Sequence, residues 1–181
     1  LVNVGEDGGN YMRLKFQGDF QVDWGDGSVT THSSNTNADH EILWDDAPSN
    51  SLTSQGYRQV IVTVTAQAGQ QLTHWNLPTS PYVPDGSGYN GSINHLVCRV
   101  KMAGENFTNT SQAMRFHKGL KEFEYVGTNN ITTASYMFNN CPNLEKVTTF
   151  DTSNIENLSH TFRTCSSLTE VPAFDLSSAT N

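Results

Sequence analysis

The chain has 181 residues, a formal net charge of −8 and only 15% charged residues, so its polarity comes largely from Ser, Thr, Asn, Gln and Gly. An acidic chain without clustered Lys and Arg lacks the charge pattern of a nucleic-acid-binding protein, and we exclude nucleic acid as a partner. No apolar run approaches the roughly 18–20 residues of a membrane span, and the length allows one or two domains.

Residues 11–77 are expected to form short β-strands. Apolar and polar side chains alternate over 12–16, 20–24 and 60–65, and these stretches are rich in Val, Thr and aromatic residues. A period of two with this composition is typical of half-buried strands. We therefore interpret residues 1–77 as an all-β sandwich.

A tight turn is predicted at residues 23–28, between two of these strands. Asp26 and Gly27 supply the positive φ that a hairpin needs, and Trp24 can fill the core. Followed by the Val- and Thr-rich stretch at 57–65, the Trp-Gly-Asp-Gly turn resembles the PKD-like family of extracellular β-sandwiches. The resemblance covers roughly residues 10–77 and implies an Ig-like sandwich.

The same turn holds weak candidates for a metal site, Asp23 and Asp26, because Ca²⁺ binds clustered carboxylate oxygens. Two Asp residues fall short of the spaced ligand set of a calcium loop, and Asp-Gly turns commonly form without metal. We therefore expect no metal and no cofactor.

Residues 78–94 are rich in Pro and Gly, a composition that interrupts regular structure, and we interpret them as a linker between two domains. Beyond the linker, Leu96, Cys98, Val100 and Met102 recur at every second position. This spacing predicts a strand that leads into the second domain.

The last third of the chain repeats itself every 24 residues. The segments 107–130, 131–154 and 155–178 superimpose without a gap, and residues 179–181 open an incomplete fourth repeat. Aligned columns are Ser111, Ser135 and Ser159; Met114, Phe138 and Phe162; His117, Cys141 and Cys165; and Leu120, Leu144 and Leu168. A period of this length indicates a solenoid, in which each repeat covers the apolar face of its neighbour.

Each repeat is expected to contain a short helix, as over 133–138, and then a short strand. The segment 151–168 combines an Asp-Thr-Ser-Asn start with Phe162, Cys165 and Leu168. This register resembles the BspA-type leucine-rich repeats of bacterial and phage surface proteins, over residues 107–178. The expected fold is therefore mixed and β-rich: the sandwich, then an α/β leucine-rich-repeat solenoid over 95–181.

The repeat register predicts unequal effects for two neighbouring substitutions. Phe138→Ser should leave a cavity and a buried hydroxyl, which costs roughly 3–5 kcal/mol. Asn139→Ser is expected to be nearly silent. An uncapped solenoid end exposes apolar side chains, so we expect the chain to continue past Asn181, with a capping partner subunit as the alternative.

Three cysteines cannot all pair within one chain. Cys141 and Cys165 share a repeat column, which favours buried apolar packing. The sequence leaves open the alternative that these two residues form a disulfide. The sequence contains no Cys-x-x-Cys, His-Glu-x-x-His, Gly-x-Ser-x-Gly or phosphate-loop motif, so we do not expect an enzyme.

The leading hypothesis is a non-enzymatic extracellular or virion-surface module that presents its solenoid to a protein or glycan. Candidate contact residues are Tyr125, Tyr136, His160 and Arg163. The alternative is a phage virion structural protein, such as a tail, fibre or capsid-decoration protein, whose solenoid end packs on a neighbouring subunit. An enzyme comes third, because it would need a catalytic domain or a paired-carboxylate cleft that the repeats do not supply.

Overall fold

The computed structural model describes residues 1–6, 9–78, 96–171 and 173–180. Apart from Pro78, the linker expected at 78–94 lies outside the described residues. The regular elements are β1 (Val2–Val4), β2 (Tyr11–Gln17), β3 (Phe20–Asp23), β4 (Val29–His32), β5 (Asn37–Glu41), the 3-10 helix η1 (Ser49–Ser51), β6 (Arg58–Val60), β7 (Thr63–Ala66), β8 (His74–Asn76), β9 (Arg99–Ala103), β10 (Glu122–Val126) and β11 (Lys146–Val147).

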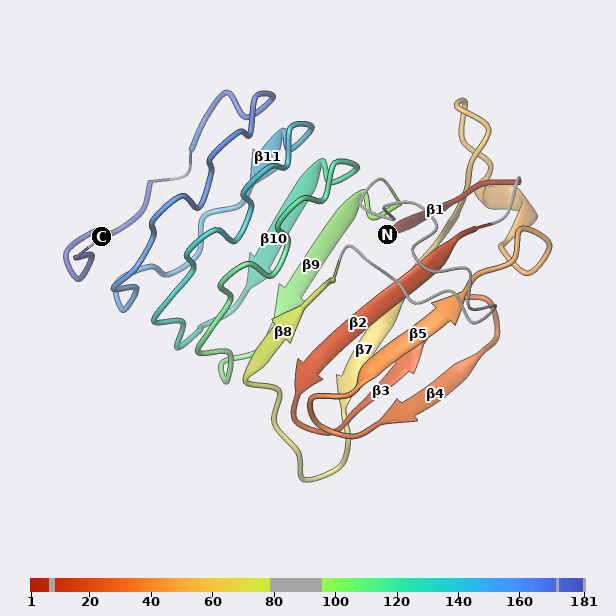
Figure 1. Cartoon of the computed structure of the whole chain (residues 1–181), viewed down its shortest axis with the longest axis horizontal. Coiled ribbons are helices and arrows are strands. Elements are labelled where there is room, and N and C mark those ends of the chain that lie inside the picture. The colour runs from red at the N-terminus through yellow and green to blue at the C-terminus, as the bar shows by residue number, and fades with distance from the viewer. Residues whose placement is uncertain (7–8, 79–95, 172, 181) are drawn as a thin grey trace.

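The expected α/β leucine-rich-repeat solenoid is wrong. Within the described ranges the one helical element is η1, and it lies far from the repeats. The strands form four separate small sheets, ordered β1-β6, β11-β10-β9, β5-β2-β8 and β4-β3-β7. The regular structure of the described chain is therefore all-β (Figure 1).

The expected repeat helices are absent from the described residues because alternate backbone groups bond between repeats. The N–H groups of Gln112 and Met114 donate to the carbonyls of Ser135 and Met137 in the next repeat, both at 2.9 Å. The N–H of Ala113, which lies between them, bonds back three residues to the carbonyl of Thr110 at 3.1 Å. An α-helix needs every N–H to bond four residues back within its own segment, so each segment is a run of turns instead.

Backbone conformation enforces these turns. Residues with φ near +60° occur twice in each repeat, and a helix cannot continue through them. They form two columns with a spacing of 24 residues: Gln112, Tyr136 and His160, and Phe116, Asn140 and Thr164.

The N-terminal part contains two antiparallel three-stranded sheets. β2 lies between β5 and β8, and β3 lies between β4 and β7. The hairpin predicted at 23–28 is present: β3 pairs with β4, Gly25 and Gly27 have positive φ, and Trp24 is buried. Alternate residues of β2 and β3 are buried. Leu14 and Phe20 are therefore in the core, as are the residues two positions away from each on the same strand.

The sheet that contains β8 continues directly into the repeats. Parallel bridges link His74 to Asn109, Asn109 to Thr133, and Thr133 to Asn157. The last two steps are each 24 residues long, so each repeat adds one layer on the edge that β8 provides. Figure 1 shows these layers stacked from β8 toward the C-terminus.

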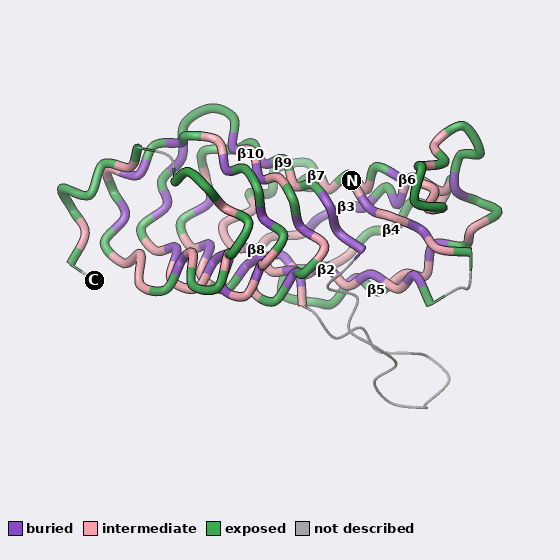
Figure 2. The backbone as a smooth tube through the Cα atoms, turned by 90° about the horizontal axis from the view of Figure 1, so that it is seen from above, coloured by how far each residue is buried: buried purple, intermediate pink, exposed green. Residues whose placement is uncertain are grey.

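A second row of strands lies on the other side of the layers. β9, β10 and β11 pair in parallel, with Arg99 opposite Glu122 and Glu122 opposite Lys146. Buried residues recur in every layer from β2 into the repeats (Figure 2), and the apolar core is one cluster that joins the two parts of the chain. In the described part of the chain, no helix has the length and hydropathy of a membrane span.

Candidate binding surface

Tyr125, one of the expected contact residues, is not at the surface. Its side chain is 5% exposed, and its hydroxyl donates to the carbonyl of Gly104. Burial raises the pKa of Tyr125 to about 12, so the phenol stays protonated. Tyr125 lies on β10, where alternate residues face the core, and this alternation removes it from the candidate contact residues.

Tyr136 and His160 are brought together by the fold. They are equivalent residues of neighbouring repeats, and their rings stack with centroids 4.7 Å apart and planes only 2° apart. The Tyr136 N–H donates to the carbonyl of Ser159 at 3.0 Å, which fixes the spacing of the two layers at this point. His160 is exposed and Tyr136 is half-buried. Arg163 is also exposed, and its N–H donates to the His160 carbonyl.

Arg115 extends this stack toward the first repeat. Its guanidinium carbon lies 4.5 Å from the ring centroid of Phe116 and 5.4 Å from that of Tyr136. The Nη1 group donates to the side-chain oxygen of Gln112 at 3.2 Å. Phe116 is 37% exposed, which is unusual for a phenylalanine. A cation flanked by two aromatic rings is a fixed and partly desolvated positive charge.

Arg115 also lines a hollow where the repeats meet the N-terminal sheet. The hollow has a volume of ≈ 450 Å³, and its lining includes Arg13 and Lys15 of β2. Arg13 is held by Asp39, with 2.5 Å between Nε and Oδ1 and 2.7 Å between Nη2 and Oδ2. Neither Lys15 nor Arg115 has an acidic partner at ion-pair distance among the described residues.

These contacts define one continuous surface, which we call the basic–aromatic stripe. Its members come from β2 and from three successive repeats. They are Arg13, Lys15, Gln112, Arg115, Phe116, Tyr136 and His160. The chain carries ten Lys and Arg residues against eighteen Asp and Glu. Arg13 is neutralised by Asp39, so the positive charge of the stripe comes from Lys15 and Arg115.

Sequence reasoning found two members of the stripe and missed the others. Gln112 shares a repeat column with Tyr136 and His160, so that column could have identified it. Arg13 and Lys15 lie on the polar side of a predicted strand, but no pattern in the sequence indicates that this strand lies beside the first repeat. The pairing of β2 with β8 and the bridge from His74 to Asn109 place them there.

The weak metal candidates have other roles. Asp23 accepts a hydrogen bond from the N–H of Gly25, and Asp26 accepts one from the N–H of Ser28, both at 2.9 Å. The other oxygen of Asp26 lies 2.6 Å from Nε2 of His40. Both carboxylates therefore stabilise the turn. Within the residues that the structure describes, no three His, Cys, Asp or Glu side chains are grouped as metal ligands.

The three cysteines are free thiols. Cys141 donates to the carbonyl of Met114 at 3.0 Å, and Cys165 donates to that of Phe138 at 3.1 Å. Both bonds span 27 residues, so the two thiols occupy equivalent places in neighbouring repeats. Burial raises the pKa of Cys141 to about 12 and also raises that of Cys165, so neither is an activated nucleophile.

The repeats are similar to a known protein family. A family model described as "Mycoplasma protein of unknown function, DUF285" matches residues 102–181, which begin in β9 and include all three repeats. No curated protein and no solved structure matched the chain.

Proposed function

We propose that this chain is a non-enzymatic attachment module of an extracellular, cell-surface or virion protein, and that it binds its ligand through the basic–aromatic stripe. The observation that carries the proposal is the contact of Arg115 with Phe116 and Tyr136, continued by the Tyr136–His160 stack. The resemblance of residues 107–178 to BspA-type repeats, and of 10–77 to PKD-like sandwiches, supports a surface location.

The chemistry of the stripe favours a glycan that carries a carboxylate. Flat aromatic faces offer apolar area with little conformational freedom to lose. Arg115 can pair with a carboxylate through two parallel N–H···O bonds, and Lys15 adds a second positive charge in the same hollow. A protein ligand would need an acidic and aromatic patch to make the same contacts.

The proposal is tested by surface plasmon resonance on two immobilised sugars that differ in one carboxylate, sialyllactose and lactose. We expect binding to sialyllactose that weakens as salt rises, because the charge contribution is screened. Arg115→Ala should weaken it by about tenfold or more, the effect of losing a central contact. Arg99→Ala is the matched control, because it removes an exposed arginine from β9, outside the stripe.

Two results would overturn the proposal. Equal binding to both sugars, unchanged in Arg115→Ala, would show that the stripe does not select a carboxylate. Absence of binding to either sugar, together with a defined oligomer in light scattering, would favour a structural component of a virion or surface layer.

A further inference from the structure

The basic–aromatic stripe runs across neighbouring strands and repeats instead of along one of them. Asn37 of β5 is paired with Lys15 of β2, and Lys15 is paired with Asn76 of β8. The bridge from β8 to the first repeat continues this sheet. Asn37, Lys15 and Asn76 line the hollow together with Arg115. β5, β2, β8 and the repeats are therefore successive layers beneath one line of polar side chains (Figure 1).

The same turn recurs in each repeat and extends this line. The N–H groups of Arg115, Asn139 and Arg163 each donate to a carbonyl three residues back, all at 3.1 Å. These three residues therefore occupy equivalent places in the first, second and third repeats. Arg163 is exposed and has no acidic partner at ion-pair distance among the described residues. We call the line from Asn37 to Arg163 across the layers the track.

Positive charge falls on every second layer of the track. Lys15 and Arg115 have β8 between them, and Arg115 and Arg163 have the second repeat between them. The intervening layers contribute neutral groups, the amide of Asn76 and the ring of Tyr136. Since neighbouring strands lie about 4.8 Å apart, the layers that carry successive cations are about 10 Å apart.

The turns of the repeats add no negative charge to the track. They lie in three segments that contain no Asp or Glu, 107–121, 131–144 and 157–169. Acidic residues of the first repeat, Glu122 and Glu124, lie on β10 in the second row of strands. Near the hollow, Asp39 is held by Arg13. A negatively charged chain laid along these turns therefore meets no like charge from them.

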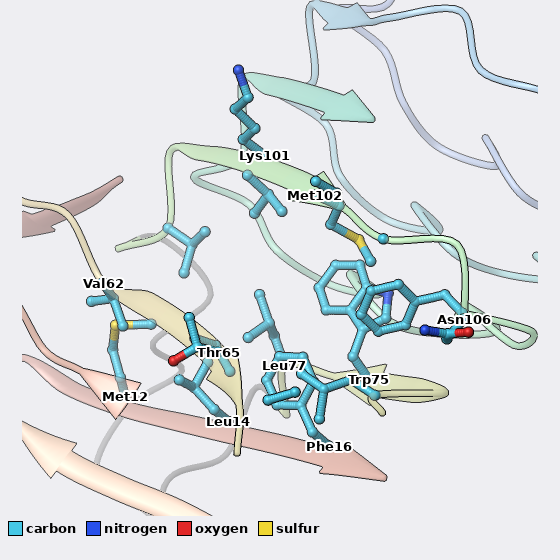
Figure 3. A pocket seen from close by; sticks show the side chains of 18 of the residues that line it. Met12, Leu14, Phe16, Val62, Thr65, Trp75, Leu77, Lys101, Met102 and Asn106 are labelled. Atoms are coloured by element: carbon cyan, nitrogen blue, oxygen red, sulfur yellow. The ribbon is translucent and has the colours of Figure 1, made fainter. Parts of the chain in front are cut away.

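A cavity of ≈ 420 Å³ between β2 and β9 does not compete for such a ligand. Met12 and Phe16 of β2 and Met102 of β9 are among the apolar side chains that line it (Figure 3). Lys101 points away from it and pairs with Glu124 at 3.2 Å. A carboxylate buried among apolar groups without a charge partner is strongly unfavourable. The track is therefore the better site for an acidic ligand.

On the basis of the proposed function, we propose that the ligand is an extended acidic polysaccharide with a carboxylate on every second sugar, and that its chain runs along the track. The rings of Tyr136 and His160 are 4.7 Å apart, so one layer has about the length that one pyranose unit adds to an extended glycan. Alternate carboxylates then reach Lys15, Arg115 and Arg163. The neutral sugars lie over the layers between these cations.

The test measures binding of fluorescein-labelled hyaluronan oligosaccharides, which carry a carboxylate on every second sugar, to the 181-residue chain by fluorescence anisotropy. We expect the hexasaccharide to bind about fivefold or more tightly than the disaccharide, the effect of at least one added exposed ion pair. Trigalacturonate carries the same three carboxylates on consecutive sugars. It should bind less tightly than the hexasaccharide, because it is too short to reach from Lys15 to Arg163.

Three variants locate the ligand on the track. Arg163→Ala should remove most of the gain from disaccharide to hexasaccharide, and Arg115→Ala should weaken the binding of both. Lys146→Ala is the matched control, because it removes an exposed cation of the second repeat from β11, outside the track; it should keep the gain. Thermal unfolding checks that the variants are folded. If Arg163→Ala is not, the comparison of the hexasaccharide with trigalacturonate on the unmodified chain decides.

Three results would overturn the inference. Equal affinity for the hexasaccharide and the disaccharide, or for the hexasaccharide and trigalacturonate, would show that no extended chain is read. If sialyllactose still competed in an Arg115-dependent way, the proposed function would stand without it. A glutamate peptide of equal charge that bound as tightly as the hexasaccharide would assign the track to an acidic protein segment. Absence of binding by every sugar, sialyllactose included, would overturn the proposed function as well.

Discussion

Nε2 of His117 lies 2.8 Å from the carbonyl oxygen of Leu77, and this contact joins the first repeat to the end of the N-terminal sheets. The imidazole is 0% exposed, so Nε2 donates to the carbonyl, and Nδ1 has no partner among the described residues. In the next two repeats the same column holds Cys141 and Cys165, whose thiols donate to carbonyls of the preceding repeat.

Because burial lowers the pKa of His117, the histidine should make stability depend on pH. Above its ordinary pKa of about 6.5 the imidazole is neutral in both states. As the pH falls below that value, the unfolded chain binds a proton that the folded chain does not, so the free energy of unfolding decreases. Urea unfolding at about pH 7.5 and about pH 5.5 measures this change.

His117→Cys is the variant that isolates this effect, because it installs the residue of the other repeats. It should reduce the loss of stability between the two pH values. His32, whose pKa is also lowered by burial, is present in both proteins and cancels. Identical pH dependence in the variant and the parent would show that burial does not lower the pKa of His117 in the folded chain.

Phe138 lies at the centre of an aromatic column that crosses three repeats. Its ring is 5.0 Å from that of Phe123 in an edge contact and 5.5 Å from that of Phe162 in a stack. Phe138 is fully buried, whereas Phe162, its equivalent in the next repeat, is only partly buried. Phe138→Ala should reduce the free energy of unfolding by about 3–5 kcal/mol.

The matched control is Phe162→Ala, which removes the same atoms from the same column. Its cost should be clearly smaller, because the ring already contacts solvent and leaves less of a cavity. Denaturant unfolding of both variants gives the comparison. A loss at Phe162 as large as that at Phe138 would show that the last layer is packed as tightly as the inner ones.

The neighbouring Asn139 shows what a repeat register cannot predict. We expected Asn139→Ser to be nearly silent, but Asn139 is buried, and its side-chain oxygen accepts a hydrogen bond from Asn140 at 2.8 Å. Its backbone carbonyl accepts from Phe116. The repeat pattern does not show that a polar side chain such as that of Asn139 is buried between the layers. Serine, shorter by two heavy atoms, should cost about 1–2 kcal/mol there.

The strands and turns of the N-terminal part could be predicted, because period-two alternation and Asp-Gly turns are local signals. The turns of the repeats were wrongly predicted as helices, since the pattern of apolar residues at Met137 and Phe138 fits a left-handed turn at Tyr136 as well as it fits a helix. The basic–aromatic stripe was predictable only in part. Tyr136 and His160 share a repeat column, whereas Lys15 and Arg115 line one hollow because segments far apart in the sequence meet there.

Asp26 and His40 form a second pH-sensitive contact, in the hairpin that follows β3. The Asp26 side chain is 3% exposed. Burial acts to raise its pKa, but the hydrogen bonds from His40 and from the N–H of Ser28 hold the pKa of Asp26 below its usual value. The folded state therefore binds this proton less readily than the unfolded state, and the contribution to stability is lost as the pH falls below about 4.

Asp26→Asn should cost about 1–3 kcal/mol at neutral pH, the worth of a buried hydrogen bond to a charged group. The matched control is Asp39→Asn, which breaks the more exposed pair with Arg13 and should cost less than about 1 kcal/mol. Thermal unfolding at neutral and acidic pH measures both. If Asp26→Asn cost the same at about pH 3 as at about pH 7, the ionised carboxylate would not be the stabilising form.

The thiols should react with Ellman's reagent in a fixed order. Cys165 is half-buried, Cys98 is 8% exposed and Cys141 is 0% exposed. Burial raises the pKa of all three, most clearly that of Cys141, to about 12. Because the thiolate is the reactive form, Cys165 should react first at about pH 8 and Cys141 last, at a rate set by opening of the repeats. In denaturant all three should react at once; two unreactive thiols there, restored by a reductant, would mean that Cys141 and Cys165 form a disulfide in solution.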